Sequence, residues 1–235
     1  MTERFSGQLA LVAGGTGGLG SAISIAFLEE GATVVVTYRR QAEFDALLHA
    51  AGASGSRLTG HNIDVTDETA ANQMISSIVA KHGRLDVMTN VVGGYAAGWK
   101  LWEAGPRILD QMLSINLYSG YTLARSVVPA MLKQGHGSIV NVASRAAIDH
   151  AGSSAAYAAS KAAAVAIVDS LAADLKGSGI RANSILPSII DTEANRKAMP
   201  NADFAQWPKP RDIARVILFL CSDDAKLIHG AAIPV

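Results

Sequence analysis

A run of glycines near the start of this chain separates an apolar segment from one with helical spacing. Leu9–Ala13 is short and uniformly apolar, which is typical of a strand buried on both faces. Ser21–Glu30 has the spacing of a helix. The intervening turn contains the pattern Gly-x-Gly-x-x-Gly, which lets the backbone approach a pyrophosphate at a helix N-terminus. This order of elements predicts a dinucleotide-binding unit built on Gly15, Gly17 and Gly20.

The rest of the chain repeats the alternation of strand and helix. This alternation predicts parallel strands joined by right-handed crossovers. We therefore predict one α/β domain over residues 1–235, with a Rossmann-type, doubly wound sheet of about seven parallel strands. The further segments that favour strands are 33–38, 56–62, 85–90, 138–142, 181–186 and 233–235, and those that favour helices are 41–51, 67–82, 108–132, 155–176 and 211–221.

Prolines interrupt this pattern at two places. Pro129 should disturb the long helix 108–132 near its end, because proline removes a backbone donor and crowds the preceding turn. The segment 187–210 should be irregular and suits a substrate loop over a site, although a plain connecting loop would have the same composition. It contains four of the seven prolines, namely Pro187, Pro200, Pro208 and Pro210.

Composition and charge limit the kinds of partner. The 235 residues are 49% hydrophobic and 17% charged, which is enough for one large domain. With 20 basic and 20 acidic residues the net charge is zero, so we expect binding to neither nucleic acid nor an anionic membrane. No run reaches the length of a membrane span, the start is charged, and Cys221 has no cysteine to pair with. We therefore expect a cytoplasmic protein, and the spacing of the six histidines predicts no metal site.

A serine, a tyrosine and a lysine indicate proton transfer. Ser144 follows the predicted strand 138–142 and should lie at the carboxyl edge of the sheet. Tyr157 and Lys161 are four positions apart in an alanine-rich helical segment, so they share one face. The ammonium should favour the ionised phenol and move its pKa towards the working pH. The three residues predict proton transfer to a carbonyl oxygen, although Tyr-x-x-x-Lys alone is common on solvated helices.

The second predicted strand ends in basic residues. A site specific for NAD usually has an acid about 20 positions after the glycines, to hold the ribose 2′-hydroxyl. This chain has Tyr38, Arg39 and Arg40 there. Because a guanidinium suits a phosphate, these residues predict NADP(H) as the preferred cofactor, with NAD(H) as the alternative. Two solvated arginines at a helix start would be the simpler explanation. Asp64 and Val65, at the next strand end, could contact adenine.

An aromatic loop with several glycines follows the fourth predicted strand. It runs through Gly93–Gly98 to Trp99 and Trp102, at the edge where open α/β sheets bind ligands. These tryptophans, with His150 and Trp207, would shape a substrate pocket or serve only as packing and surface. Asn116 lies within the long helix 108–132, where a surface position is the simplest explanation.

Over essentially its whole length the chain resembles the short-chain dehydrogenase/reductases. Their Thr-Gly-x-x-x-Gly-x-Gly signature occurs at residues 13–20, with Ala13 in place of threonine. Their Asn-Asn-Ala-Gly occurs at 90–93 with Val91, and their Pro-Gly-x-x-x-Thr at 187–192 with Ser188. These departures affect local hydrogen bonds rather than the fold. The resemblance implies four catalytic residues, Asn116, Ser144, Tyr157 and Lys161.

The resemblance also implies the role of each residue. Tyr157 would give a proton to the carbonyl oxygen, which Ser144 would also hydrogen-bond. Lys161 would lower the pKa of the tyrosine and hold the nicotinamide ribose, and Asn116 would position the lysine through water. We therefore predict an NAD(P)-dependent oxidoreductase that acts on a small-molecule carbonyl or alcohol. The predicted cofactor contacts are Gly14, Thr16, Gly17, Gly18, Leu19, Gly20, Tyr38, Arg39, Arg40, Asp64, Val65, Asn90, Gly93, Tyr157, Lys161, Pro187, Ile190 and Thr192.

A symmetric assembly is a further implication of the resemblance. Members of this family often pair through the catalytic helix and the helix that carries the asparagine, so we expect a homodimer or a homotetramer. Small residues on the outer side of the catalytic helix would let a second copy approach closely. They are Ala158, Ala159, Ala162, Ala163 and Ala166.

Two other functions remain open. The segments 191–207 and 93–96 resemble the dihydropteridine reductases, which reduce a quinonoid dihydropterin with the tyrosine and lysine but without the serine. That branch favours NADH with an acid after the second strand, which this chain lacks. A non-catalytic, dinucleotide-binding sensor is the other alternative. The complete set of four catalytic residues argues against a sensor, which would need none of them in register.

Overall fold

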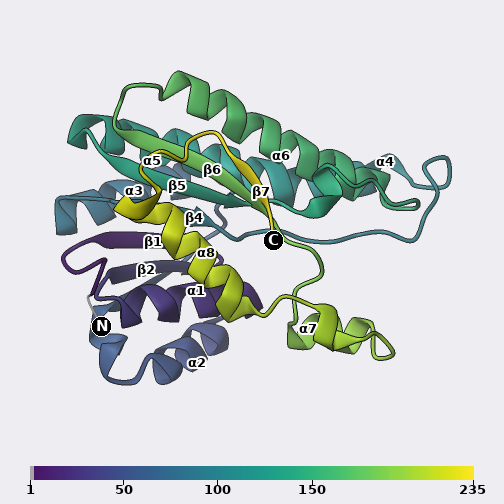
Figure 1. The fold of residues 1–235 in the computed structure, drawn as a ribbon, viewed down its shortest axis with the longest axis horizontal. Helices are drawn as coiled ribbons and strands as arrows, with labels where there is room; N and C mark the ends of the chain where they lie inside the picture. The colour runs from purple at the N-terminus through teal and green to yellow at the C-terminus, as the bar shows by residue number, and fades with distance from the viewer. Residues whose placement is uncertain (1–2) are drawn as a thin grey trace.

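The computed structural model describes residues 3–235, which form a sheet of seven strands (Figure 1). The strand order is β3-β2-β1-β4-β5-β6-β7 and all neighbouring pairs are parallel, so the predicted doubly wound sheet is confirmed. Met1 and Thr2, which begin the charged start of the chain, lie outside the described residues. The strands are β1 (Leu9–Ala13), β2 (Thr33–Tyr38), β3 (Leu58–Asn62), β4 (Val87–Asn90), β5 (Gly137–Val142), β6 (Ile180–Leu186) and β7 (Ala232–Pro234).

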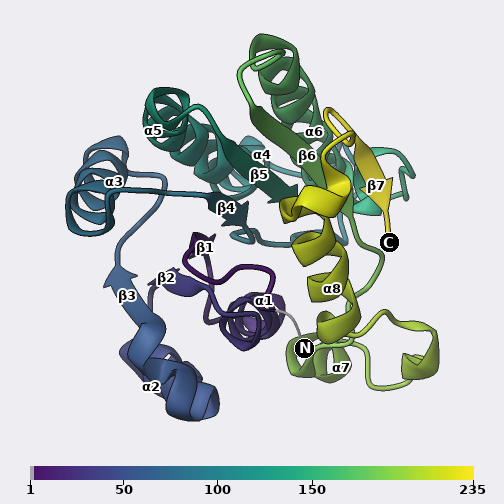
Figure 2. The ribbon, with the colours of Figure 1, turned by 60° about the vertical axis from the view of Figure 1, so that its left-hand side comes forward.

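Helices cover both faces of the sheet. Helices α1, α2 and α8 contribute to the core on one face, and α3, α5 and α6 to the core on the other (Figure 2). Between them the helices complete three layers, helix, sheet and helix. Their bounds are α1 (Gly18–Glu29), α2 (Gln41–Ala51), α3 (Glu68–His82), α4 (Pro106–Leu113), α5 (Ser119–Gln134), α6 (Ala155–Asp174), α7 (Glu193–Ala198) and α8 (Pro210–Cys221).

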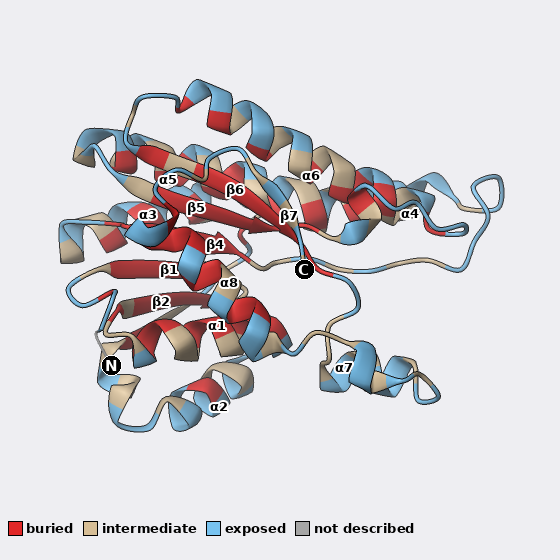
Figure 3. Cartoon of the chain, viewed as in Figure 1, coloured by how far each residue is buried: buried red, intermediate tan, exposed pale blue. Residues whose placement is uncertain are grey.

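The central strand β1 supplies side chains to both cores. Ala10 and Val12 lie in the core beneath α1 and α8, and Leu9 and Leu11 lie in the core beneath α3 and α5. Successive side chains of a strand point to opposite faces, so a strand covered on both faces must be apolar throughout. Figure 3 shows these buried central strands between helices with exposed outer sides. Their position explains the unbroken apolar run in the sequence.

The order of the strands reverses on either side of β1. From β1 the chain moves outward to β2 and β3, and then returns to the other side of β1 with β4. Ala13 and Asn90, the last residues of β1 and β4, are paired neighbours in the sheet. Loops that leave such a switch point diverge and open a crevice at the carboxyl edge. The topology therefore places the glycine loop and the loop after β4 on either side of one crevice.

Asp86 braces the opposite, amino edge of the sheet. Its buried carboxylate accepts hydrogen bonds from the Leu9 N–H and the Arg84 Nε, each at 2.7 Å, and lies 2.9 Å from His136 Nε2. Burial opposes ionisation of Asp86, but these hydrogen bonds outweigh it and lower the pKa of the carboxyl. The starts of β1, β4 and β5 are thereby joined at the edge away from the crevice.

Several predicted boundaries need correction. β3 begins at Leu58 rather than at residue 56, because Gly52–Arg57 forms a 3₁₀ helix. The helix predicted over 108–132 consists of α4, a π-helical turn at Ser114–Tyr118, and α5. Pro129 does not shorten it, since α5 continues to Gln134 and ends before Gly135, which has a φ of 79°. The missing N–H of Pro129 is tolerated because α5 is held by its packing against α3 and α6.

Two other expectations also change. The segment 187–210 is more regular than we predicted, because it contains α7 and a 3₁₀ turn at Phe204–Gln206. Helix α6, with 20 residues, is long and apolar enough to cross a membrane by length and composition, so our expectation of no such run was wrong. In the fold, however, α6 packs against β6 and α4, and Lys161 and Ser160 lie on its buried side. Contact with the protein core accounts for its apolar composition.

Candidate active site

The glycines after β1 serve two purposes. A Cβ on Gly15 would clash with Val36 of β2, and one on Gly20 would clash with the carbonyl oxygen of Gly14. A Cβ on Gly17 would instead have that oxygen as its nearest neighbour, at 3.7 Å, with open space beyond it. Gly15 and Gly20 therefore let the loop pack against the sheet and against α1. Gly17 leaves room for a ligand.

The N-terminus of α1 opens into this room. Gly17 is its N-cap, and the first turn of α1 itself contains no acidic side chain that would offset the positive end of the helix. In α3, by contrast, the Asp67 carboxylate caps the first turn by accepting from the N–H groups of Thr69 and Ala70. Backbone donors without a side-chain cap bind phosphate well. The start of α1 therefore fits the pyrophosphate of a dinucleotide.

A groove of about 640 Å³ extends from the glycine loop along the carboxyl edge of the sheet. Its volume lies in the range of cofactor sites. Glu43 of α2, Gln111 of α4, and Ser114 and Ile115 of the π-helical turn line the groove as well. No sequence motif marks these four positions as ligand contacts. The predicted cofactor contacts that line the groove are Gly14, Thr16, Gly17, Tyr38, Arg39, Arg40, Asp64, Val65 and Gly93.

Other predicted cofactor contacts lie behind the groove or beside it. Leu19 is buried in the core, and Asn90 is buried where its Nδ2 donates to Asn141 Oδ1 at 2.9 Å. A Cβ on Gly18 would lie 2.9 Å from Thr192 Cγ2, so the segment after β6 closes against the glycine loop. In that same segment the carbonyl oxygens of Pro187 and Ile190 accept hydrogen bonds from Arg145 N and Asn195 Nδ2.

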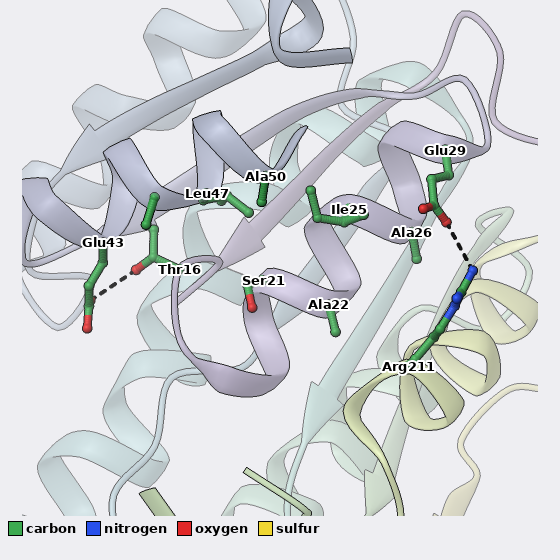
Figure 4. Close-up of a pocket in the computed structure, with 11 residues that line it drawn as sticks. Thr16, Ser21, Ala22, Ile25, Ala26, Glu29, Glu43, Leu47, Ala50 and Arg211 are labelled. Carbon is green, nitrogen blue, oxygen red and sulfur yellow. Dashed lines mark hydrogen bonds and ion pairs between the residues drawn. The ribbon is translucent and has the colours of Figure 1, made fainter. Parts of the chain in front are cut away.

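Each arginine at the end of β2 is paired with an acid. Arg39 Nη1 lies 2.6 Å from Asp64 Oδ2, and Arg40 Nη2 donates to Glu43 Oε1. The other oxygen of Glu43 accepts a hydrogen bond of 3.3 Å from the Thr16 hydroxyl, as Figure 4 shows. Both arginine side chains remain largely exposed, at 68% and 77%. They are thus available to a ligand but not free of local partners.

The structure brings Ser144 and Tyr157 together. Ser144 follows β5, and its Oγ accepts a hydrogen bond of 3.2 Å from Ala146 N. The ring of Tyr157 meets Tyr95 edge-on, with ring centroids 4.8 Å apart. Burial raises the pKa of Tyr157, the Ser144 hydroxyl partly offsets this, and Tyr95 raises it further. The direction is opposite to the one that we predicted from Lys161, because burial of the phenol dominates.

Lys161 is buried one helical turn from Tyr157. Its Nζ donates to the carbonyl of Val142, the last residue of β5, at 3.1 Å. Burial lowers the pKa of Lys161 to about 8. A Cβ on Gly93 would lie 3.1 Å from Nζ and 3.0 Å from Asn116 Oδ1. Lys161 and Asn116 therefore converge under Gly93, at the lining of the groove.

Asn116 is buried, so the surface position that we thought simplest for it was wrong. It belongs to the π-helical turn, a feature that often redirects a side chain at a functional site. Its Oδ1 accepts from Gly94 N at 2.9 Å, and its Nδ2 donates to Gly94 O and Ser160 Oγ, both at 3.0 Å. Asn116 thereby joins the loop after β4 to α6.

The aromatic residues after β6 pack within their own segment. Arg196 forms a two-pronged ion pair with Asp191, at 2.5 and 2.8 Å, and its guanidinium lies 4.8 Å from the Phe204 ring centroid. Phe204 in turn packs on Trp207, with centroids 4.9 Å apart and planes tilted by 54°. The segment after β6 is therefore stabilised by contacts among its own side chains. Among the other candidate pocket residues, Trp102 is 79% exposed and Trp99 lines a separate hollow of about 260 Å³.

Known proteins resemble this chain in both sequence and fold. The family model described as enoyl-(acyl carrier protein) reductase matches residues 13–235. The 3-oxoacyl-[acyl-carrier-protein] reductase FabG of Thermotoga maritima is 31% identical over 240 residues, which cover 99% of this chain and 97% of that protein. This chain belongs to the short-chain dehydrogenase/reductase family. The family predicted from the sequence motifs is therefore confirmed. This short-chain dehydrogenase/reductase is an NAD(P)-dependent oxidoreductase.

Other members of the short-chain dehydrogenase/reductase family match over almost the whole chain. The D-threitol dehydrogenase of Mycolicibacterium smegmatis is 32% identical, over 97% of this chain and 91% of that protein. A short-chain dehydrogenase/reductase structure from Burkholderia xenovorans superposes with a TM-score of 0.92 and 32% identity, covering 99% of this chain and 96% of the other. The structure of ElxO with NADP bound gives a TM-score of 0.91 with 26% identity, covering 97% and 96%.

Proposed function

We propose that Tyr157 is the general acid/base of this enzyme, in hydride transfer between NADP(H) and a carbonyl or alcohol substrate. The observation that carries the proposal is the convergence of residues at one sheet edge. Lys161 and Asn116 meet beneath Gly93, which lines the groove. Tyr157 lies beside Ser144 and is one turn away from Lys161 on α6. These side chains come from the segment after β5, from α6 and from the π-helical turn, which only the fold brings together.

The chain supplies the proton and its environment. NADP(H), when bound, would supply or accept the hydride. Because burial raises its pKa, the phenol of Tyr157 is neutral at pH 7 and can donate its proton to a carbonyl oxygen. The Ser144 hydroxyl can hydrogen-bond the same oxygen. With a pKa of about 8, Lys161 is mostly charged at neutral pH, so its ammonium would stabilise the phenolate that remains.

Arg39 and Arg40 support NADP(H) as the preferred cofactor. Both line the groove and present exposed guanidinium groups, which suit a 2′-phosphate. ElxO, a structural relative, is known with NADP bound. Because Asp64 and Glu43 pair with these arginines, NAD(H) remains the alternative cofactor.

An ordinary ketone or aldehyde is the substrate class that we favour over a dihydropterin. A planar pterin would need an open aromatic slot, whereas Phe204 packs on Trp207 and on the guanidinium of Arg196. The position of Ser144 beside Tyr157 also favours a carbonyl, because a serine at the proton acceptor serves carbonyl reduction. A non-catalytic sensor would require none of these contacts.

Substitution of Tyr157 by phenylalanine tests the proposal. The ring and its packing are kept while the proton is removed, so turnover with NADPH should fall at least about 100-fold. NADPH binding, followed by its fluorescence, should persist. Reduction of a ketone, an aldehyde and quinonoid dihydropterin should be assayed side by side.

Tyr95→Phe is the matched control for this experiment. It removes a hydroxyl from the ring that packs edge-on against Tyr157 but leaves the phenol of Tyr157 in place, so turnover should fall far less than in Tyr157→Phe. Turnover by Tyr157→Phe close to that of the wild type would refute the assigned role. Reduction of the dihydropterin alone, with no ketone or aldehyde accepted by the wild type, would overturn the substrate class.

We also propose that the enzyme is a cytoplasmic homodimer or homotetramer with no nucleic-acid or membrane partner. Its net charge of zero offers no basic field for such partners. Cys221 is buried in the core and unpaired, and burial raises the pKa of its thiol to about 12, so it is unreactive. A chain that needs no disulfide suits a reducing compartment.

A further inference from the structure

The basic end of the groove is electrically balanced. Two guanidinium groups, Arg39 and Arg40, face two carboxylates, Asp64 and Glu43, in direct ion pairs. All four residues line the groove. A 2′-phosphate carries nearly two negative charges at neutral pH. It would therefore meet a site whose positive charge is already matched by acids of this chain.

Glu43 differs from Asp64 in what holds it. The Oδ1 of Asp64 accepts from both the N–H and the hydroxyl of Thr66, at 3.0 and 2.7 Å, so this acid also shapes the turn after β3. Glu43 instead lies in the first turn of α2, at the positive end of the helix dipole. Its two oxygens accept from Arg40 and from Thr16 of the glycine loop. Glu43 thus links α2 to the glycine loop.

We propose that Glu43 is a specificity-determining residue that limits the preference of this enzyme for NADP(H) over NAD(H). It does so in two ways. It holds Arg40, which a 2′-phosphate has to draw away from the carboxylate, and it adds a negative charge at the edge where that phosphate would lie. Neither effect acts on a cofactor without the 2′-phosphate. The inference rests on the proposed function, in which this groove binds NADP(H).

Glu43→Gln is the variant that isolates the charge. Glutamine keeps the length of the side chain, an oxygen acceptor for Thr16 and a high helix propensity, so the fold is preserved. Asp45→Asn is the matched control. Asp45 is exposed on the same helix and accepts from Gln41 Nε2 at 2.9 Å, outside the groove lining. Both variants remove one negative charge from α2, but only Glu43→Gln removes a charge that lines the groove.

Binding is measured by titration calorimetry with two ligands that differ only in the 2′-phosphate, adenosine 2′,5′-bisphosphate and adenosine 5′-monophosphate. Glu43→Gln should tighten binding of the bisphosphate about five- to tenfold and change that of the monophosphate by less than about twofold. Asp45→Asn should alter neither. In an Arg40→Ala background the gain from Glu43→Gln should shrink, because the released guanidinium is missing.

The outcomes separate this inference from the proposed cofactor preference. An unchanged ratio of the two affinities in Glu43→Gln, with a wild type that discriminates, would overturn the role of Glu43 and leave the preference intact. A wild type that binds both ligands equally contradicts the preference. If Glu43→Gln then creates a preference for the bisphosphate, the role of Glu43 is upheld. A gain of equal size in bisphosphate affinity in Asp45→Asn would refute the role of Glu43, because such a gain would reflect net charge alone.

Discussion

Lys161 combines a charged group with a buried position. The residue is 5% exposed, and its ammonium donates to the carbonyl of Val142 rather than to a carboxylate. A charge removed from water without an anionic partner is unfavourable, so burial lowers the pKa to about 8. At neutral pH the lysine is still mostly protonated. The residue is thus tuned to stay charged where the proposed chemistry needs a cation, at a cost in stability.

The pH dependence of stability should reveal this cost in the protein without added cofactor. Below pH 8 the lysine is charged in both states and folding buries the charge, whereas above its ordinary pKa of 10.5 it is neutral in both. The wild type should therefore gain up to about 3 kcal/mol of unfolding free energy relative to Lys161→Met as the pH rises from 8 to 10.5. Urea unfolding at several pH values measures this difference. A difference that does not vary with pH would contradict the lowered pKa.

At the scale of elements, the glycines between β1 and α1 differ in whether packing requires them. Gly20 is needed because the first turn of α1 touches the carbonyl of Gly14. Gly17 is not needed for packing, since a Cβ there would meet no atom closer than 3.7 Å. One motif thus contains a glycine that the fold requires, Gly20, and one that leaves room for the proposed ligand, Gly17.

Alanine at each of these positions should separate the two requirements. Gly20→Ala forces the backbone to shift and should lower the free energy of unfolding by about 1–3 kcal/mol. Gly17→Ala should cost less stability and weaken NADPH binding by about tenfold or more, because a methyl group would occupy the room at the start of α1. Denaturant unfolding and NADPH fluorescence titration give the two readouts. NADPH affinity in Gly17→Ala equal to that of the wild type would show that the pyrophosphate does not lie there.

At the scale of the whole molecule, α5 and α6 leave an outer face uncovered within the described chain. The two helices border a shallow hollow of about 490 Å³, lined by Tyr121, Ala124, Val128, Ala166 and Ile167 among others. Tyr121 is 41% exposed. Ala158, which we expected on this outer side, is buried, and Ala162 is partly buried against the core cluster of Ala143, Ala147 and Leu186. Ala166 lines the hollow, and its small side chain permits close approach of a second copy.

Light scattering at micromolar concentration should give two or four times the chain mass of 24.4 kDa. Ala166→Arg places a long cation on the uncovered face and should reduce the mass to that of one chain. Ala80→Arg, on the exposed side of α3, serves as the control and should not change the assembly. A monomeric wild type would leave helix propensity as the reason for the alanines of α6.

The sequence alone predicted the features that depend on near neighbours. The bounds of β1, β2 and α2 agree with their predicted ranges, because apolar runs, β-branched residues and helical spacing act over a few positions. The glycine motif and the Tyr157–Lys161 spacing are likewise local. Together they indicated the parallel sheet, the family and the edge at which the proposed site lies.

Only the tertiary structure decided how the side chains of the site are partnered. Asn116 bonds Gly94, 22 positions earlier, and Ser160, 44 positions later, and the Thr16 hydroxyl meets Glu43 across 27 positions. The raised pKa of Tyr157 follows from burial, which depends on the whole packed structure. No pattern in the sequence encodes such pairs, because they arise where the switch in strand order brings separate loops to one edge of the sheet.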